Sequence, residues 1–235
     1  EYVLIIEGAK EETVTYSLEE AINLAKKLMQ DGFSASAAAK EAATITGIKK
    51  SDIDATFKLL KSPKVVALGE IGLDYHWVED EEGRNNQKEW FKKQIEIANE
   101  NKLPIIVHNR DASNDCLEIL RETKPLYGGV MHCYSGSVEL AKEFIKLGLY
   151  ISLGGPVTFK NARVPKEVAA AIPLDRLLIE TDCPYLSPHP LRGTLNEPKN
   201  IVYVAKEIAL LRNMSEEELI EATYKNALKC FTCKL

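Results

Sequence analysis

The feature that most constrains the fold is an apolar run that recurs along the chain and ends each time in a residue able to bind a metal ion. In the clearest example, Leu177 to Ile179 lead into the carboxylates Glu180 and Asp182. Short apolar runs of this kind are typical of buried parallel strands, whose C-terminal ends carry the functional residues of α/β barrels. Three further runs lead into Glu70, His108 and His132.

Strand and helix patterns alternate from Lys61 onward, which predicts a parallel α/β sheet. Expected strands lie near 64–69, 104–109, 128–133, 149–154 and 176–181. Expected helices lie near 86–101, 112–122, 137–147, 164–171, 198–211 and 215–229. A closed (β/α)₈ barrel needs eight strands. We therefore expect a TIM-barrel-like (β/α) fold that is incomplete, or is completed by the N-terminal region or by another chain.

The first sixty residues have a different pattern. A strand-like run, Tyr2 to Ile6, precedes three short helices, the first opened by a Ser17-Leu-Glu-Glu20 capping box. Such helices resemble a helix-turn-helix module, which docks on nucleic acid, but they also suit a small packing bundle. The balance of lysines and acids favours the bundle. We expect two regions, a helical segment over 1–60 and a partial barrel over 61–235.

The net charge of −5 argues against bulk attraction to nucleic acid or to an anionic membrane. It does not exclude a nuclease whose metal ions supply local positive charge. No apolar run approaches the ~20 residues of a membrane span, so no membrane partner is expected. The five scattered cysteines suit a reducing, cytoplasmic location. A zinc or redox half-site at Cys230 and Cys233 is the less favoured reading of that pair.

Carboxylates and imidazoles are combined in the predicted site, at Glu70, His108, His132 and Asp182. Such a mixture suits Mg²⁺, Mn²⁺ or Zn²⁺ and indicates an open catalytic site with one or two ions. Glu70 is a candidate bridge between two ions ~3.5–4 Å apart. Asp182 is a candidate to accept the proton of an attacking water. Glu180 is a candidate to orient a ligand from behind.

Polar side chains near these strand ends are candidate substrate ligands: Arg110, Ser135, Arg192 and Asn196. Arg110 follows His108 by two residues and suits a phosphate, or an ion pair with Asp74 or Asp111. Ser135 begins a helical segment, where backbone N–H groups form either an anion site or an ordinary cap. Arg192 and Asn196 lie in a proline-rich loop at the predicted mouth of the site.

At these residues the chain resembles the TatD family of metal-dependent deoxyribonucleases, which have a TIM-barrel-like (β/α) metallo-hydrolase fold. The matching motifs are Gly69-Glu-Ile-Gly-Leu-Asp74, Pro104-Ile-Ile-Val-His-Asn-Arg-Asp-Ala112, Met131-His-Cys-Tyr-Ser-Gly136, Ser152-Leu-Gly-Gly-Pro156 and Leu178-Ile-Glu-Thr-Asp-Cys-Pro-Tyr-Leu186. The resemblance covers residues 60–235. It implies a 3′–5′ exonuclease or related phosphodiesterase acting on DNA, with metal ligands at Glu70, His108, His132 and Asp182.

The N-terminal part departs from that family. TatD proteins begin with a strand bearing a His-x-His pair, whereas this chain has no histidine before His76. Residues 1–57 instead resemble the C-terminal domain of the 16S rRNA 2′-O-methyltransferase I family, without its cofactor domain, so we predict no methyl transfer. The barrel is thus expected to be truncated at its N-terminal strands, as in a fusion or chimera.

The missing histidine pair has two expected consequences. One metal site is weakened, so the activity is impaired, or the chain is a non-catalytic chimera that retains only the fold. The exposed barrel edges also offer unpaired strands to another copy, which predicts a homo-oligomer. A third alternative is an RNA-associated module directed by the N-terminal helices.

Overall fold

The computed structural model describes six stretches of the chain: 18–30, 38–40, 42, 59, 62–78 and 80–231. The chain divides into two compact units, Glu1–Val65 and Val66–Leu235. Several expected features lie outside the described residues: the strand Tyr2–Ile6, the Ser17 cap, Cys233 and, apart from Leu59, the third N-terminal helix.

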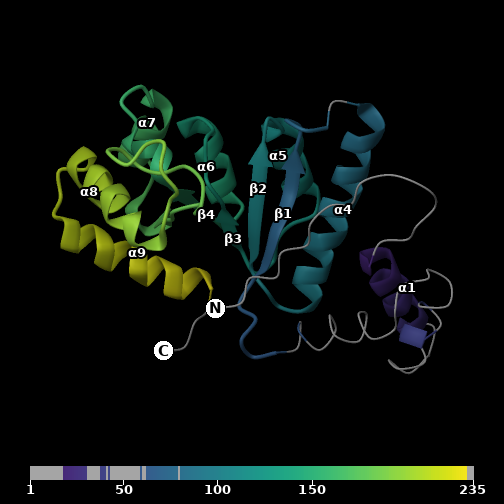
Figure 1. The fold of residues 1–235 in the computed structure, drawn as a ribbon. Coiled ribbons are helices and arrows are strands. Elements are labelled where there is room, and N and C mark those ends of the chain that lie inside the picture. The colour runs from purple at the N-terminus through teal and green to yellow at the C-terminus, as the bar shows by residue number, and fades with distance from the viewer. Residues whose placement is uncertain are drawn as a thin grey trace. The chain divides into compact units, whose positions relative to one another are not determined.

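The described part of the first unit centres on helix α1, Leu18–Gln30 (Figure 1), which confirms the expected first helix. Its buried face recurs at helical spacing and packs with small residues that follow it. The cluster consists of Ala21, Ile22, Ala25, Ala38, Ala39 and Ala42.

The second unit is built on a five-stranded sheet in the order β1-β2-β3-β4-β5, and every neighbouring pair is parallel. The strands are β1 Leu68–Asp74, β2 Ile105–Arg110, β3 Gly129–Met131, β4 Leu149–Leu153 and β5 Leu177–Ile179. This confirms the parallel α/β sheet.

Strand β1 begins later than the apolar run Val65–Leu68 suggests, and it extends to Asp74. The shift follows from close pairing with β2. A side chain at Gly72 would place its Cβ 1.9 Å from the carbonyl oxygen of His108, and one at Gly69 would meet Ile106. Because these glycines allow the two backbones to approach, Glu70 lies inside the strand rather than beyond its end.

Six helices connect or follow the strands: α4 Glu81–Glu100, α5 Ser113–Glu122, α6 Val138–Lys146, α7 Arg163–Ala171, α8 Ile201–Leu211 and α9 Glu216–Cys230. Short 3₁₀ segments occur at η1 Gly155–Thr158, η2 Leu174–Arg176 and η3 Pro198–Asn200. Helix α4 starts earlier than expected because Asp80 caps it by accepting from the Gly83 N–H. The expected capping box of Ser215 and Glu218 opens α9. None of the described helices is long and apolar enough to cross a membrane.

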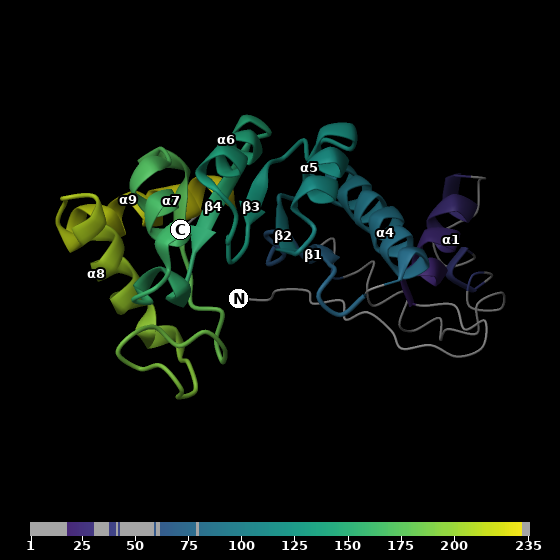
Figure 2. The same ribbon diagram turned by 90° about the horizontal axis from the view of Figure 1, so that it is seen from above.

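One face of the sheet has an apolar half and a polar half. Ile106, Val130, Tyr150 and Leu178 pack against the end of α9, at Ala227, Cys230 and Phe231. In Figure 1, α9 lies below the strands, whereas β1 and β2 point upward. Because side chains alternate along a strand, residues two positions further on face the same way. His108, His132 and Glu180 are those residues, so the polar half lies at the C-terminal strand ends, which Figure 2 shows from above.

Candidate metal centre

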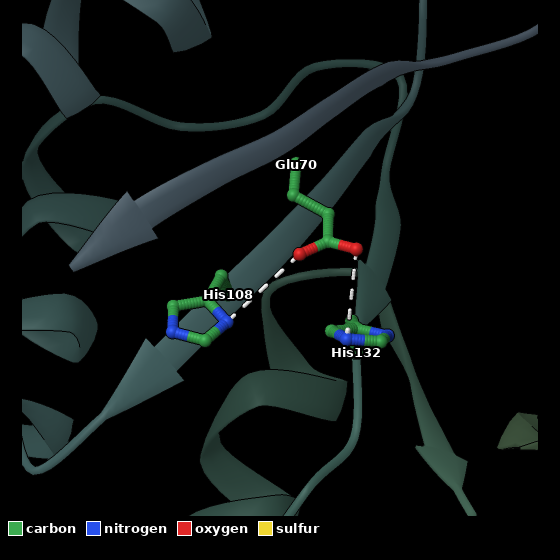
Figure 3. Close-up of side chains that lie close together, drawn as sticks. All are labelled: Glu70, His108 and His132. Atoms are coloured by element: carbon green, nitrogen blue, oxygen red, sulfur yellow. Dashed lines mark ion pairs between the residues drawn. The ribbon is translucent and has the colours of Figure 1, made fainter. Parts of the chain in front are cut away.

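Three side chains from successive strands converge at this polar half. One ligand atom each of Glu70, His108 and His132 lies within 4.8 Å of the others. The Glu70 carboxylate stands between the two rings (Figure 3), with Oε2 4.0 Å from His108 Nδ1 and Oε1 3.7 Å from His132 Nε2. Glu70 comes from β1, His108 from β2, and His132 directly follows β3.

Asp182 joins this group through His132. Its Oδ1 lies 3.3 Å from His132 Nε2, the same nitrogen that faces Glu70. The chain turns sharply here, since Asp182 has a φ of 53° and its carbonyl accepts from the Tyr185 N–H at 2.9 Å. The structure therefore brings together all four residues that the sequence suggested as metal ligands.

A carboxylate supports each imidazole from behind. Glu180 Oε1 lies 3.0 Å from His132 Nδ1 and also accepts the Cys133 N–H at 3.0 Å. Asp74 Oδ2 lies 3.1 Å from His108 Nε2. Such contacts orient a histidine so that its other nitrogen faces the ion. Sequence reasoning suggested this role for Glu180 but missed it for Asp74, although Asp74 ends the same strand that carries Glu70.

The candidate metal centre carries more carboxylates than imidazoles, so its net charge is negative. Burial opposes a charge on His132, but hydrogen bonds with Asp182 and Glu180, together with the charges of Glu180 and Glu70, outweigh it and raise the pKa of His132 to about 10. Four carboxylates surround two imidazoles, so a cation would relieve their repulsion. Mixed nitrogen and oxygen donors fit a divalent ion.

The centre is open on one side. The Glu70 side chain is 41% exposed, whereas that of His132 is only 14% exposed. An ion held by these residues would therefore be reachable by water or substrate from the Glu70 side, which is typical of catalytic rather than structural sites.

The expected substrate ligand Asn196 is buried and fully occupied within its own loop. Its Nδ2 donates to the carbonyls of Thr181 at 2.6 Å and Tyr185 at 2.8 Å. Its Oδ1 accepts from the Glu197 N–H and from Asn200 Nδ2, each at 3.0 Å. The amide thus holds the backbone on both sides of Asp182 and has no donor or acceptor left for a substrate, which argues against Asn196 as a substrate contact.

The other three candidates are exposed at the surface. The guanidinium of Arg110 lies 5.8 Å from the centroid of the Trp77 ring, while its two suggested acidic partners, Asp74 and Asp111, contact histidines instead. The guanidinium of Arg192 lies 3.8 Å from the Phe159 ring centroid. Ser135 lies near the start of α6, but Ser137 caps that helix, accepting from the Leu140 N–H.

Comparisons with known proteins agree with this geometry. The profile of the family described as TatD related DNase matches residues 5–232. Over 169 residues the chain is 56% identical to the uncharacterized metal-dependent hydrolase YabD of Bacillus subtilis, covering 72% of this chain and 66% of YabD. Over 181 residues it is 44% identical to the uncharacterized metal-dependent hydrolase YcfH of Escherichia coli, covering 77% of this chain and 68% of YcfH. The chain thus spans about two thirds of the length of these relatives.

Solved structures give the same picture. YjjV, a TatD homologue from Escherichia coli, superposes with a TM-score of 0.68 at 26% identity, covering 92% of this chain and 82% of YjjV. A TatD-family hydrolase from Entamoeba histolytica shares the fold, with a TM-score of 0.64 at 23% identity, over 89% of this chain and 72% of that one. The suggested methyltransferase resemblance of residues 1–57 stays unconfirmed, since the TatD profile itself begins at residue 5. The match of that profile, together with the identity to YabD, shows that this chain belongs to the TatD-related DNase family of metal-dependent hydrolases.

Proposed function

We propose that the chain hydrolyses phosphodiester bonds of DNA with a divalent ion held by Glu70, His108, His132 and Asp182. The observation that carries this proposal is the convergence of three ligand atoms within 4.8 Å, with Asp182 in contact with one of them. The family's description as DNase-related supports DNA as the substrate. The two imidazoles favour Mn²⁺ or Zn²⁺, while Mg²⁺ fits the carboxylates.

The residues of the chain have separate tasks in this mechanism. A divalent ion in the site would supply a Lewis acid that activates water and offsets the charge of a phosphate. We propose that Asp182, whose side chain is 27% exposed, would accept a proton from that water. Glu180 and Asp74 fix the two rings. Arg110, Ser135 and Arg192 are exposed polar groups that we propose as contacts for the DNA backbone.

The decisive test combines metal content with nuclease activity. The purified chain should contain a divalent metal and cleave DNA with Mg²⁺ or Mn²⁺. The substitution Asp182→Ala should lower the rate by at least about 100-fold, because it removes both a ligand and the proton acceptor. Glu118→Ala, an exposed acid on α5, serves as the control and should leave the rate unchanged. Activity that survives Asp182→Ala would come from a contaminant.

We propose that one ion is bound rather than two. Ligand atoms of Glu70, His108 and His132 lie within 4.8 Å of one another, and they are the one candidate metal-binding group among the described residues. No histidine precedes His76 that could hold a second ion. Elemental analysis should give about one equivalent of metal for each chain. Two equivalents would contradict this proposal, and one equivalent without hydrolysis would favour the non-catalytic alternative.

We also propose that copies of the chain associate through the edges of the sheet. Within the described residues, β1 and β5 each pair with only one other strand. Unpaired strand edges present backbone N–H and C=O groups to another chain. Light scattering coupled to size exclusion should show a mass above 26.2 kDa at high protein concentration. A clean monomer at that concentration would rule out this association.

The cysteines support our proposal of a cytoplasmic location. None of the four described cysteines is in a disulfide, and Cys116 and Cys230 are buried. Free thiols suit a reducing compartment, because an oxidising one favours disulfides. Fractionation of the source cells should recover the chain with the cytoplasm, and recovery from an oxidising compartment would contradict the proposal.

A further inference from the structure

The turn between β1 and α4 presents a large aromatic side chain to solvent. Trp77 is 75% exposed. The guanidinium of Arg110 lies 5.8 Å from the centroid of its ring. Single exposed apolar residues are common on protein surfaces and need no special explanation. Here, however, the surroundings of the indole give it a defined position beside the candidate metal centre.

Contacts on both sides hold the turn that carries Trp77. The Tyr75 N–H donates to the carbonyl of Arg110, and the His76 N–H donates to Asp74 Oδ1, each at 2.9 Å. On the other side, Arg84 Nε donates to the Val78 carbonyl at 3.0 Å. The His76 ring also meets the indole edge-on, with the centroids 4.6 Å apart. A group held in place this way loses little freedom when it binds a ligand.

The same contacts connect the turn to the metal centre. Asp74 uses one carboxylate oxygen for the turn and the other for His108, at 3.1 Å. In the register of β1 with β2, Asp74 lies opposite Arg110, which follows His108 by two residues. An extended strand rises about 3.3 Å per residue, so the Arg110 backbone lies about 7 Å beyond that of His108. The Trp77 ring, 5.8 Å from the Arg110 guanidinium, thus lies next to the strand end that carries His108.

We propose that Trp77 stacks on an unpaired nucleobase of the DNA, while Arg110 contacts the adjoining phosphate. This inference rests on the proposed function, since it names the form of DNA that the same site accepts. An exposed aromatic face beside a cation is the usual arrangement for binding single strands. In a duplex both faces of a base are already stacked, so Trp77 favours single-stranded DNA or frayed ends.

Tryptophan fluorescence tests the stacking without any need for catalysis. The chain has two tryptophans, Trp77 and Trp90, and Lys93 lies over the ring of the second. In the variant Trp90→Phe, a cleavage-resistant single-stranded phosphorothioate oligonucleotide should quench the emission of Trp77 saturably. An abasic oligonucleotide of equal length should leave it nearly unchanged. Trp77→Phe, which retains Trp90, should show no quenching by either. Equal quenching by both oligonucleotides, or by neither, would overturn the inference.

Kinetics give a second, independent readout. The ratio of kcat/KM on single-stranded DNA to kcat/KM on the abasic oligonucleotide should fall by about 5- to 50-fold in Trp77→Ala. Trp77→Phe should keep most of this preference, and Arg110→Gln should lower both values alike. An unchanged ratio in Trp77→Ala, with an active parent chain, would overturn the inference and leave the proposed function intact. If the parent chain cleaves neither substrate, the proposed function fails, and fluorescence alone decides the role of Trp77.

Discussion

The two loops that flank the metal centre are stabilised in different ways. The short turn after β1 is held at its ends and leaves Trp77 exposed. The long loop after β5 has hydrogen bonds of its own, since Asn196 binds the backbone around Asp182 and Ser187 Oγ donates to the Thr194 carbonyl. Thr158, at the end of η1, also accepts the His189 N–H of this loop.

This difference shows how to separate a ligand from a structural residue. Asn196 and Arg110 both looked like substrate contacts, because each is polar and close to a strand end. All polar atoms of the Asn196 amide are hydrogen-bonded within the protein, whereas Arg110 is exposed and its guanidinium lies 5.8 Å from the centroid of the Trp77 ring. A buried amide that is already satisfied gains nothing from a substrate, while an exposed cation keeps its donors available.

The largest effect is expected from disrupting the close pairing of β1 with β2, which precedes the turn that carries Trp77. Gly72→Ala forces a Cβ to within 1.9 Å of the His108 carbonyl oxygen, at a φ of 142°. We expect a loss of about 3–5 kcal/mol in the free energy of unfolding, measured by urea denaturation, or failure to fold. Gly148→Ala is the matched control, because its φ is 90° but nothing lies within 4 Å. It should cost only about 1–2 kcal/mol. Similar losses for both glycines would contradict the close approach of β1 and β2.

The internal bonding of the β5 loop predicts the next largest effect. Asn196→Ala leaves the carbonyls of Thr181 and Tyr185 without their donor, so we expect a loss of about 2–3 kcal/mol in unfolding free energy. Nuclease activity should fall as well, since Asp182 lies between them. Asn161→Ala, at an exposed asparagine, is the control and should change stability by less than about 0.5 kcal/mol. If Asn196→Ala were as mild as this control, the loop would not depend on the amide.

The smallest effect concerns the reactivity of two thiols, one exposed in the loop after β5 and one buried in helix α5. Cys183 is exposed in that loop, whereas burial raises the pKa of the Cys116 thiol in α5 to about 12. At pH 9 only about one Cys116 in a thousand would be a thiolate, so iodoacetamide should label Cys183 in the native chain. Cys116 should react only after unfolding, as peptide mass spectrometry would show. Rapid native labelling of Cys116 would contradict its burial.

Much of the sheet could be predicted, because its strands are short apolar runs with clear ends. The bounds of β2 and β4 agree with the expected ones to within one residue, and the Ser215 box marks the start of α9. The start of β1 was misplaced because the approach of Gly72 to β2 depends on tertiary pairing, which the apolar pattern does not reveal.

The candidate site was predicted in its centre but not at its margins. Glu70, His108, His132 and Asp182 could be found because parallel strands bring their carboxyl ends to one edge. The support from Asp74 depends on which way its side chain turns, and the role of Asn196 depends on burial. Neither the direction of the Asp74 side chain nor the burial of Asn196 follows from a periodic pattern in the sequence, so neither could be predicted from it.

The four proposed metal ligands come from four different strand–helix units, and this has a consequence for stability. A fragment that stops before β5 lacks Asp182, so an ion bound by all four residues would require β1, β2, β3 and β5 to be in place. Because such an ion would bind only the assembled arrangement, an ion at 100 times its Kd would contribute about 2.7 kcal/mol to the stability of the whole sheet. Removal of the metal would therefore destabilise parts of the fold far from the centre, and the resistance of the chain to heat would depend on how much metal is available.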